Sequence, residues 1–406
     1  MRTIALKKII GFFLMTLSLT ACHSPAYISG KLQGTEGKDI KVYIIEPKNL
    51  TDIAASYFGK VIDSAVVNAD GSFEFRNLPE SREPVLLELA VQQPGMPPGY
   101  LQTEDPLKSN YMPIVWQSGE PVQISAGADE FQSSFSIDRP SEINKALLDL
   151  RDIAEEAYQK YLSGKDWQIE DGSQLMEKEN GVANYRKELI NFADTIQYLI
   201  PALVAIRWVS PENDYERMPE FLVRQCNNWT IKQPAHPWVK QLCSESNPSD
   251  LPVLVGDEFP DFNFPMLTKD TISLKDLLGS KLTIIDLWAS WCAPCRMENR
   301  KVLEPIWDEY HNQGLQIIAY GLESDEAVWR EAAESDGADK WFQASDLQGD
   351  FAPFLKEIRI RTIPANFILD NKGVVVAKNV HGSALTDLVK SLMKDSLILR
   401  KHSAGY

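Results

Sequence analysis

Apolar and polar residues alternate along much of the first third of this chain. Residues 41–46 and 61–67 alternate in the manner of strands that bury one face. Residues 68–71 (Asn-Ala-Asp-Gly) are a turn signal, and 72–76 alternate again, which predicts a β-hairpin across the turn. Further apolar runs fit additional strands. The pattern therefore predicts a small β-sandwich over 26–138.

The pattern changes to a helical period after residue 140. Ser141 is a residue type that caps helices, and apolar residues follow it at spacings of three and four. A second apolar stretch, 185–208, is predicted to be helical with a break at Pro201. Shorter helical stretches follow, and 247–252 is a polar linker with two prolines. We therefore expect a helical region over 141–246.

The last part of the chain, 253–406, mixes short apolar runs with amphipathic stretches. The run 282–288 predicts a buried strand, and the helix after it is expected to end at Gly314. A second apolar strand at 315–320 and a hairpin over 366–377 follow, with helical segments between and after them. This order predicts a mixed sheet with helices on both faces, an α/β domain.

Two thiols stand close together directly after the apolar run 282–288. In Trp291–Cys295 (Trp-Cys-Ala-Pro-Cys), the first cysteine falls where a helix is predicted to begin. A helix N-terminus carries unpaired N–H groups and a partial positive charge, which lower the pKa of Cys292 below the ~8.5 of a free thiol. Cys295 lies one turn later and can close a disulfide. The pattern predicts a site of dithiol–disulfide exchange.

The first 21 residues have the composition of a targeting segment. Basic side chains precede an apolar stretch, 9–20, that is shorter than the ~20 residues of a membrane-spanning helix. The small residues before Cys22 resemble the lipobox of bacterial lipoproteins, in which the cysteine is acylated. This resemblance implies a lipoprotein signal peptide at 1–21, export, and a lipid anchor at Cys22. The alternative is an ordinary signal peptide in which Cys22 has no such role.

The net charge of the 406-residue chain, −16 at pH 7, limits its partners. An acidic protein is repelled by the phosphate backbone, so we expect no nucleic-acid partner. The remaining content, 44% hydrophobic and 24% charged residues, is ordinary for a globular protein.

Two cysteines are left after Cys22 and the Cys-x-x-Cys pair are assigned. Cys226 and Cys243 lie on what are predicted to be consecutive helices. An exported protein meets an oxidising compartment, where such a pair forms a structural disulfide. Two buried free thiols are the alternative.

Three separated motifs resemble the thioredoxin superfamily. They are Trp291–Cys295 after a strand, Thr362–Pro364 (Thr-Ile-Pro) before an antiparallel strand, and Cys295–Glu298 (Cys-Arg-Met-Glu). The last resembles the TlpA/ResA branch, which comprises envelope-tethered thiol-disulfide oxidoreductases. The resemblance implies a thioredoxin fold over 253–406. The β-rich segment is similar to N-terminal domains often found ahead of such folds.

The resemblance implies roles for individual residues. Cys292 would be the exposed nucleophile that forms a mixed disulfide with the substrate, and Cys295 the buried thiol that resolves it. Pro364 would be a cis proline that faces the disulfide. Trp291, Ile363 and Pro364 would form the substrate-binding side, where an extended substrate segment pairs with the Ile363 backbone as an added strand.

The same resemblance implies that two carboxylates transfer protons. Asp286 lies six residues before Cys292, inside an apolar strand where burial of a carboxylate is costly without a purpose. Glu298 lies one turn after Cys295. These carboxylates would relay the proton when Cys295 becomes the attacking thiolate. For Glu298, an exposed charge on the helix surface is the alternative.

Three positions depart from the family pattern. Arg300 stands where the branch usually has proline, and Ala365 follows the expected cis proline where threonine is common. Tyr320 replaces a lysine that many thioredoxins have at the end of that strand. These departures leave the expected fold intact and concern proton handling.

The two residues between the cysteines bear on the direction of electron flow. Ala293 and Pro294 supply no positive charge to stabilise the thiolate, whereas strongly oxidising relatives often carry histidine there. We therefore expect a periplasm-facing reductant of disulfides in exported proteins, with no cofactor beyond the Cys292–Cys295 pair. A reductant outside the cytoplasm needs a membrane thiol-electron donor as a partner.

Other functions compete with this interpretation. In one, the N-terminal regions make the protein a surface-binding lipoprotein with a secondary redox role. A peroxiredoxin-like peroxidase needs Thr or Ser three residues before its cysteine, where this chain has Ala289. A copper-delivering relative needs a histidine where 362–364 stand, and His381 lies beyond them. A zinc site needs four ligands, of which one Cys-x-x-Cys supplies two, so we expect no metal.

Overall fold

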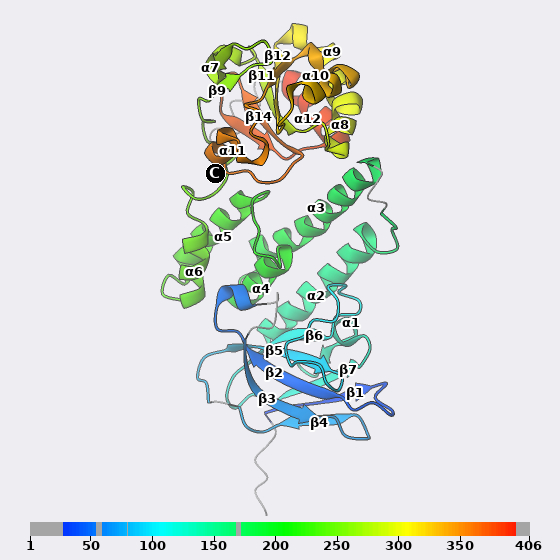
Figure 1. The fold of residues 1–406 in the computed structure, drawn as a ribbon. Coiled ribbons are helices and arrows are strands. Elements are labelled where there is room, and N and C mark those ends of the chain that lie inside the picture. Colours follow the sequence, from blue (N-terminus) through cyan, green and yellow to red (C-terminus); the bar gives the residue numbers. More distant parts are fainter. Residues whose placement is uncertain (1–26, 54–58, 79, 168–171, 395–406) are drawn as a thin grey trace, which may run out of the picture.

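The computed structural model of this chain describes residues 27–53, 59–78, 80–167 and 172–394. The predicted signal peptide, 1–21, and Cys22 lie outside these residues. In Figure 1 a β-rich part, a layer of helices and an α/β part follow one another along the molecule.

The β-rich part, 27–138, is a sandwich of two four-stranded sheets. Its strands are β1 (Ile28–Gln33), β2 (Lys41–Glu46), β3 (Lys60–Val66), β4 (Ser72–Phe75), β5 (Val85–Gln92), β6 (Tyr111–Trp116), β7 (Val122–Gly127) and β8 (Ser136–Ile137). One sheet has the order β4-β1-β7-β8 and the other β3-β2-β5-β6. Apolar side chains of both sheets, such as Ile28 and Leu86, meet in one core. The expected β-sandwich-like fold of this N-terminal part is therefore confirmed.

The hairpin predicted over 61–76 is wrong in its pairing. The turn forms, because the N–H of Asn68 donates to the carbonyl of Ser72 (2.8 Å). However, β3 pairs with β2, and β4 pairs with β1 in the opposite sheet. The turn thus carries the chain from one sheet to the other. Alternation shows which face of a strand is buried but not which strand is its partner.

The helical region contains four long helices and one shorter helix, after a short one in the sandwich. They are α1 (Phe131–Ser134), α2 (Glu142–Tyr161), α3 (Gly172–Thr195), α4 (Leu199–Val209), α5 (Pro219–Lys232) and α6 (Pro237–Glu245). Ser141 caps α2 as predicted, since its Oγ accepts from Asn144 N (3.3 Å). The break predicted at Pro201 lies instead at 196–198. Pro201 occupies the first turn of α4, where an N–H has no helical partner to lose.

The sandwich and the helices share one hydrophobic core. All six residues of β6 are buried, because one face of the strand packs in the sandwich and the other against helices. The Asn144 side chain of α2 binds both the N–H (2.7 Å) and the carbonyl (2.8 Å) of Val115 in β6. Residues 253–393 enclose a second, separate core.

The C-terminal part is built on a five-stranded sheet of order β13-β12-β11-β14-β15. Its strands are β11 (Leu282–Trp288), β12 (Leu315–Gly321), β13 (Phe342–Ala344), β14 (Ala365–Asp370) and β15 (Val375–Lys378), with β9 (Asn263–Pro265) and β10 (Thr271–Ser273) forming a small separate ladder. β11, β12 and β13 are parallel, whereas β14 and β15 are antiparallel to their neighbours.

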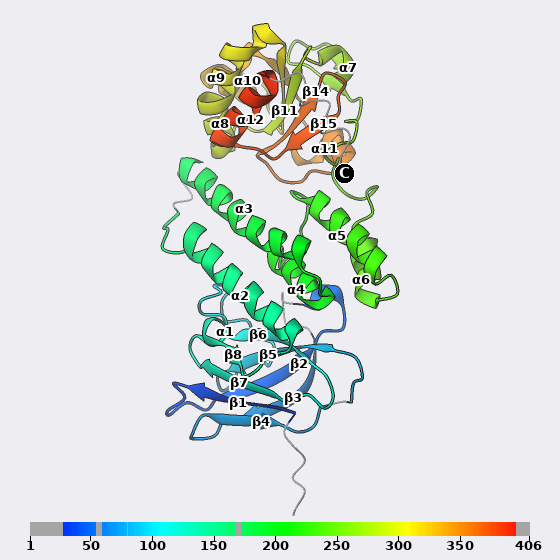
Figure 2. The same cartoon turned by 180° about the vertical axis from the view of Figure 1, so that it is seen from behind.

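Helices cover both faces of this sheet (Figure 2). They are α7 (Leu274–Leu277), α8 (Ala293–Glu298), α9 (Glu304–Tyr310), α10 (Glu326–Ser335), α11 (Pro353–Ile358) and α12 (Gly382–Lys394). A π-helical turn, η2 (Asn299–Leu303), joins α8 to α9. Gly314 ends this helical segment at a φ of 106°, a left-handed conformation that favours glycine. The predicted mixed α/β architecture is confirmed.

Candidate active site

The buried strand β11 brings the chain to the start of α8. Every side chain of β11 is buried. Cys292 is the N-cap residue of α8, and its Sγ is bonded to the Sγ of Cys295, with the two Cα atoms 5.3 Å apart. The Cys292 sulfur also accepts a hydrogen bond from the N–H of Cys295 (3.4 Å). This donor belongs to the unpaired N–H groups at the helix start, so it favours a thiolate on Cys292 once the disulfide is reduced.

The two cysteine residues differ little in exposure. Cys292 is 5% exposed and Cys295 2%, whereas Trp291 beside them is 65% exposed. The expected contrast between an exposed and a buried thiol is therefore small in this disulfide form. Trp291 projects into solvent beside the disulfide. The helix α3 of the helical region packs against α8.

A buried glutamate, which the sequence did not point to, holds the loop before the disulfide. Glu323 follows β12, and its two carboxylate oxygens accept from the N–H and the Oγ of Ser290, the latter at 2.9 Å. The two residues are 33 positions apart. Because Ser290 precedes Trp291 and Cys292, this pair fixes the path of the loop that presents the disulfide.

The loop 359–364 between α11 and β14, which we call the cis-proline loop, lies beside the strand that leads to the disulfide. The Ile363–Pro364 peptide bond is cis, and β14 begins at the next residue. In the antiparallel pairing of β11 with β14, Leu287 is opposite Ala365. Pro364 therefore lies at the end of β11 from which the disulfide loop departs. Pro364 is buried, while Ile363 is partly exposed.

Asp286 is buried in the middle of this arrangement. It is 3% exposed and stands opposite Asn366 of β14 and Ala319 of β12. Burial, and in second place the negative charge of Glu298, raises the pKa of the Asp286 carboxyl well above its usual range. A raised pKa brings a carboxyl closer to the pKa of a thiol, which favours proton exchange between two such groups.

Glu298 is also buried, so the alternative of an exposed charge is wrong. Its carboxylate accepts from the N–H of Gly382 (3.1 Å), and its Oε2 lies 2.7 Å from Nδ1 of His381. His381 also lies 3.4 Å from the side-chain nitrogen of Asn366. No local signal in the sequence marks His381 as a partner of Glu298, because the two residues are 83 positions apart. The structure therefore joins Asp286, Glu298 and His381 into one buried acid–base cluster.

Comparison with known proteins identifies this domain. A family model described as Redoxin matches residues 254–392. Over 133 residues the chain is 31% identical to the thioredoxin-like protein YneN of Bacillus subtilis, covering 32% of this chain and 73% of that relative. This chain belongs to the TlpA/ResA-like thiol-disulfide oxidoreductases of the thioredoxin superfamily.

Two further similarities agree in extent. The thiol-disulfide oxidoreductase ResA of Bacillus thuringiensis is 28% identical over 141 residues, which are 34% of this chain and 77% of the relative. A solved thiol-disulfide oxidoreductase from Bacteroides fragilis is 28% identical, with a TM-score of 0.31, and covers 34% of this chain and 99% of that one. The Redoxin match spans the α/β part. The expected thioredoxin fold and thiol-disulfide oxidoreductase activity are confirmed.

The departures from the TlpA/ResA pattern have structural counterparts. Arg300, which stands where the resemblance led us to expect proline, lies in the π-helical turn η2. Arg300 and Arg296 both bind the buried carboxylate of Asp336, with Arg296 Nε at 2.8 Å. Tyr320 is fully buried and packs against Phe354, with ring centroids 4.7 Å apart. Tyr320 is thus part of an aromatic core with Phe262, Phe264 and Phe354.

The second cysteine pair lies in the helical region. Cys226 in α5 and Cys243 in α6 are bonded at an S–S distance of 2.10 Å. Thr230 approaches the sulfur of Cys243 to 3.2 Å. The pair joins two consecutive helices, and its structural role stays a proposal.

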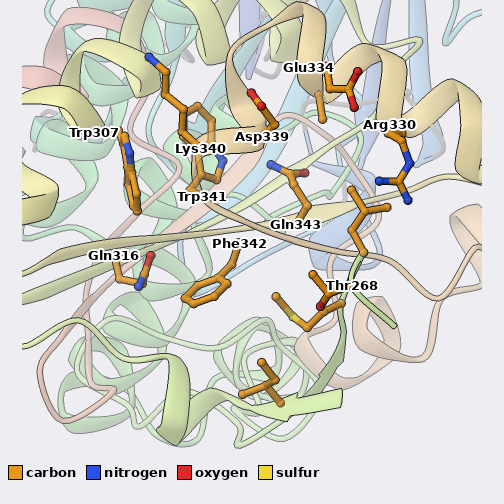
Figure 3. Close-up of a pocket in the computed structure, with 14 residues that line it drawn as sticks. Thr268, Trp307, Gln316, Arg330, Glu334, Asp339, Lys340, Trp341, Phe342 and Gln343 are labelled. Carbon is orange, nitrogen blue, oxygen red and sulfur yellow. The ribbon is translucent and has the colours of Figure 1, made fainter. Parts of the chain in front are cut away.

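A cavity of about 490 Å³ lies away from the disulfide (Figure 3). It is lined by residues of β13, α9 and α10, among them Trp307, Phe342 and Arg330. None of its lining residues belongs to the disulfide loop or the cis-proline loop. Within the described residues, no group of three or more His, Cys, Asp or Glu side chains is placed to hold a metal ion. No helix in that part of the chain has the length and apolar character needed to span a bilayer.

Proposed function

We propose that this enzyme is an envelope-anchored reductase of disulfides in exported proteins. One observation supports this most directly: the Cys292–Cys295 disulfide lies at the N-terminus of α8, and the cis-proline loop lies at the end of β11 from which the disulfide loop departs. Such a site needs no cofactor, because the two sulfurs themselves carry the two electrons.

Reduction of a substrate begins on the dithiol form. The Cys292 thiolate, stabilised by the N–H of Cys295, attacks one sulfur of the substrate disulfide. A mixed disulfide forms, the substrate S–S bond breaks, and the departing substrate thiolate takes up a proton. The extended substrate segment pairs with the backbone of Ile363, beside Trp291, during this step.

The second step releases the reduced substrate. The Cys295 thiol gives its proton to the acid–base cluster around Asp286, and the resulting thiolate attacks the Sγ of Cys292. The mixed disulfide breaks, the second substrate sulfur leaves as a thiolate that takes the proton back from the cluster, and the Cys292–Cys295 disulfide forms. Glu298 and His381, whose side chains are in contact at 2.7 Å, complete the cluster. In total, two electrons and two protons pass to the substrate.

The direction of electron flow follows from the residues between the cysteines. Ala293 and Pro294 carry no charge, so the thiolate of the reduced form lacks the additional stabilisation that makes a disulfide strongly oxidising. The enzyme is then returned to its dithiol form by a thiol-electron donor in the membrane.

The proposed lipid anchor rests on the sequence of residues 1–22, which precede the described part of the chain. Export through the signal peptide at 1–21 and acylation at Cys22 place the redox domain at a membrane facing the periplasm. Labelled fatty acid fed to expressing cells should enter the wild-type protein and not the Cys22→Ser variant. Equal labelling of both proteins, or of neither, would contradict the anchor without touching the redox proposal.

The redox proposal is tested by reduction of insulin with dithiothreitol as the electron source. The wild type should accelerate the reaction, and Cys292→Ser should abolish the acceleration. As a matched control, Cys226→Ser with Cys243→Ser removes the distant disulfide and should retain turnover. Turnover that survives Cys292→Ser would overturn the proposal.

A further inference from the structure

A buried carboxylate of the helical region accepts hydrogen bonds from the cis-proline loop. Glu216 lies between α4 and α5, and its Oε1 accepts three hydrogen bonds: from the N–H of Arg361 (3.1 Å), the N–H of Thr362 (3.1 Å) and the Oγ1 of Thr362 (2.8 Å). Its Oε2 accepts from Nε of Arg361 (2.9 Å). Thr362 directly precedes the Ile363–Pro364 bond.

The Glu216 carboxylate is buried, and both of its oxygens accept hydrogen bonds. The Glu216 side chain is 4% exposed, although Arg361 is 74% exposed. A buried carboxylate is stable only when its lone pairs are satisfied, and four donors from two adjacent residues do so here. Asp214 completes the arrangement, because its Oδ1 accepts from the backbone N–H of Glu216 (3.0 Å) and also approaches Arg361 (3.3 Å).

The segment that carries Glu216 is itself fixed on the α/β domain. Glu220, one turn further, binds Lys378 (2.8 Å) and the N–H of Val255 (2.9 Å). The carbonyl of Arg217 accepts from the side chain of Asn379 (3.4 Å). Glu216 therefore approaches the loop from a rigid support that is 145 residues away in sequence.

We propose that Glu216 is a positioning residue for substrate binding, through which the helical region sets the conformation of the cis-proline loop. The proposal rests on the function proposed above, in which an extended substrate segment pairs with the backbone of Ile363. Glu216 holds the two preceding N–H groups and leaves the Ile363 backbone for the substrate. A loop ordered beforehand does not have to be ordered by the substrate, so the substrate binds more tightly.

The test separates binding from chemistry. The full-length enzyme, with dithiothreitol as reductant, is assayed against a peptide with one intramolecular disulfide and against the small reagent dithiobis(nitrobenzoate), which has no backbone to pair. Glu216→Ala should raise KM for the peptide by about tenfold, the factor expected for loss of one strong hydrogen-bonded anchor, and leave kcat unchanged. The rate with the small reagent should not change.

Two further variants keep the test decisive. Glu216→Gln retains an oxygen for Arg361 N and Thr362 but presents an amide N–H to the guanidinium, so its KM should lie between those of Glu216→Ala and the wild type. Glu212→Gln, on an exposed residue of the same segment, should match the wild type. If Glu216→Ala unfolds the protein, the KM of Glu216→Gln for the peptide tests the proposal in its place.

The outcomes distinguish the two proposals. Wild-type turnover with unchanged peptide KM in Glu216→Ala and Glu216→Gln would overturn the positioning role and leave the reductase proposal standing. An equal loss of rate with both substrates would also overturn it, because the effect would then lie in the chemistry of Cys292. Absence of peptide reduction by the wild type would instead defeat the reductase proposal.

Discussion

At the scale of single residues, buried charge is the property that marks the active site. Asp286, Glu298 and Glu323 are all buried, each in a position where a neutral residue would cost less. Glu298 and Glu323 are satisfied by specific donors. Asp286 is distinguished by a pKa raised through burial and through the charge of Glu298.

Asp286 should make the stability of the protein fall as pH rises. Since its pKa is higher in the folded protein than in the unfolded chain, the folded state holds more protons above about pH 4. The free energy of unfolding therefore falls until the pH exceeds the folded pKa. Asp286→Asn should remove this fall, leaving the variant more stable than the wild type at pH 8 by about 1.4 kcal/mol per unit of pKa shift.

Denaturant unfolding of the dithiol-reduced protein at several pH values measures this. Asp387→Asn, an exposed position in α12, is the matched control and should keep the wild-type pH dependence. If Asp286→Asn and the wild type show the same pH dependence, Asp286 does not hold its proton in the folded state.

The sequence predicted some of these residues and not others. Asp286 was predictable because a carboxylate inside an apolar strand is conspicuous, and Cys292 and Cys295 because their spacing after a strand is specific. Glu323, His381 and Glu216 were not, because each acts through a partner 33, 83 or 145 residues away. A lone acidic or imidazole side chain gives no local signal of such a partner.

At the scale of elements, the helix that carries the disulfide is held from its side. Asp336, at the C-cap of α10, is fully buried and binds Arg296 of α8 and Arg300 of η2. One carboxylate thus ties the active-site helix to the π-helical turn that follows it. π-Helical turns are frequent at functional sites, and this one contains Arg300, the position at which the family resemblance led us to expect proline.

Asp336→Asn should destabilise the protein by about 2 kcal/mol, because it weakens charge-assisted hydrogen bonds at a buried acceptor. The two arginine side chains are 27% and 40% exposed, so they regain water and limit the loss. Equilibrium denaturation measures the change. Asp339→Asn, an exposed position in the next turn, is the control, and an equal effect of both substitutions would contradict the assigned role.

Elements were easier to predict from the sequence than their pairing. The strand 282–288 and the helix ending at Gly314 follow from apolar runs and a terminal glycine, which are local signals. The sheet change after residues 68–71 and the π-helical turn depend on contacts between distant segments. The helix break was predicted at Pro201, and not at 196–198, because proline breaks the interior of a helix but is tolerated in the first turn of one.

At the scale of the whole molecule, two cores meet at a junction of charged residues. The sandwich and helices form one packed unit, and the α/β domain forms the other. Lys378 of β15 is almost fully buried, donates to the carbonyl of Val253 (2.8 Å) and binds Glu220 of α5 (2.8 Å). Burial lowers the pKa of Lys378, and Glu220 opposes that shift. The sequence predicted the two regions but gave no sign of this junction.

Glu220→Gln should destabilise the protein by about 3 kcal/mol, since it leaves the Lys378 ammonium buried without its counter-charge. Lys378→Met in the same background should recover part of the loss, and a double-mutant cycle on the free energy of unfolding measures the coupling. Strictly additive effects would show that Lys378 and Glu220 do not stabilise one another across the junction.

The central claim is that Cys292 attacks the substrate and Cys295 releases it. The most direct measurement is mass spectrometry of the Cys295→Ser protein after incubation with a disulfide peptide. We expect a stable adduct of protein and peptide on Cys292, absent from Cys292→Ser. An adduct on Cys295 in the Cys292→Ser variant, with none on Cys292 in Cys295→Ser, would contradict it.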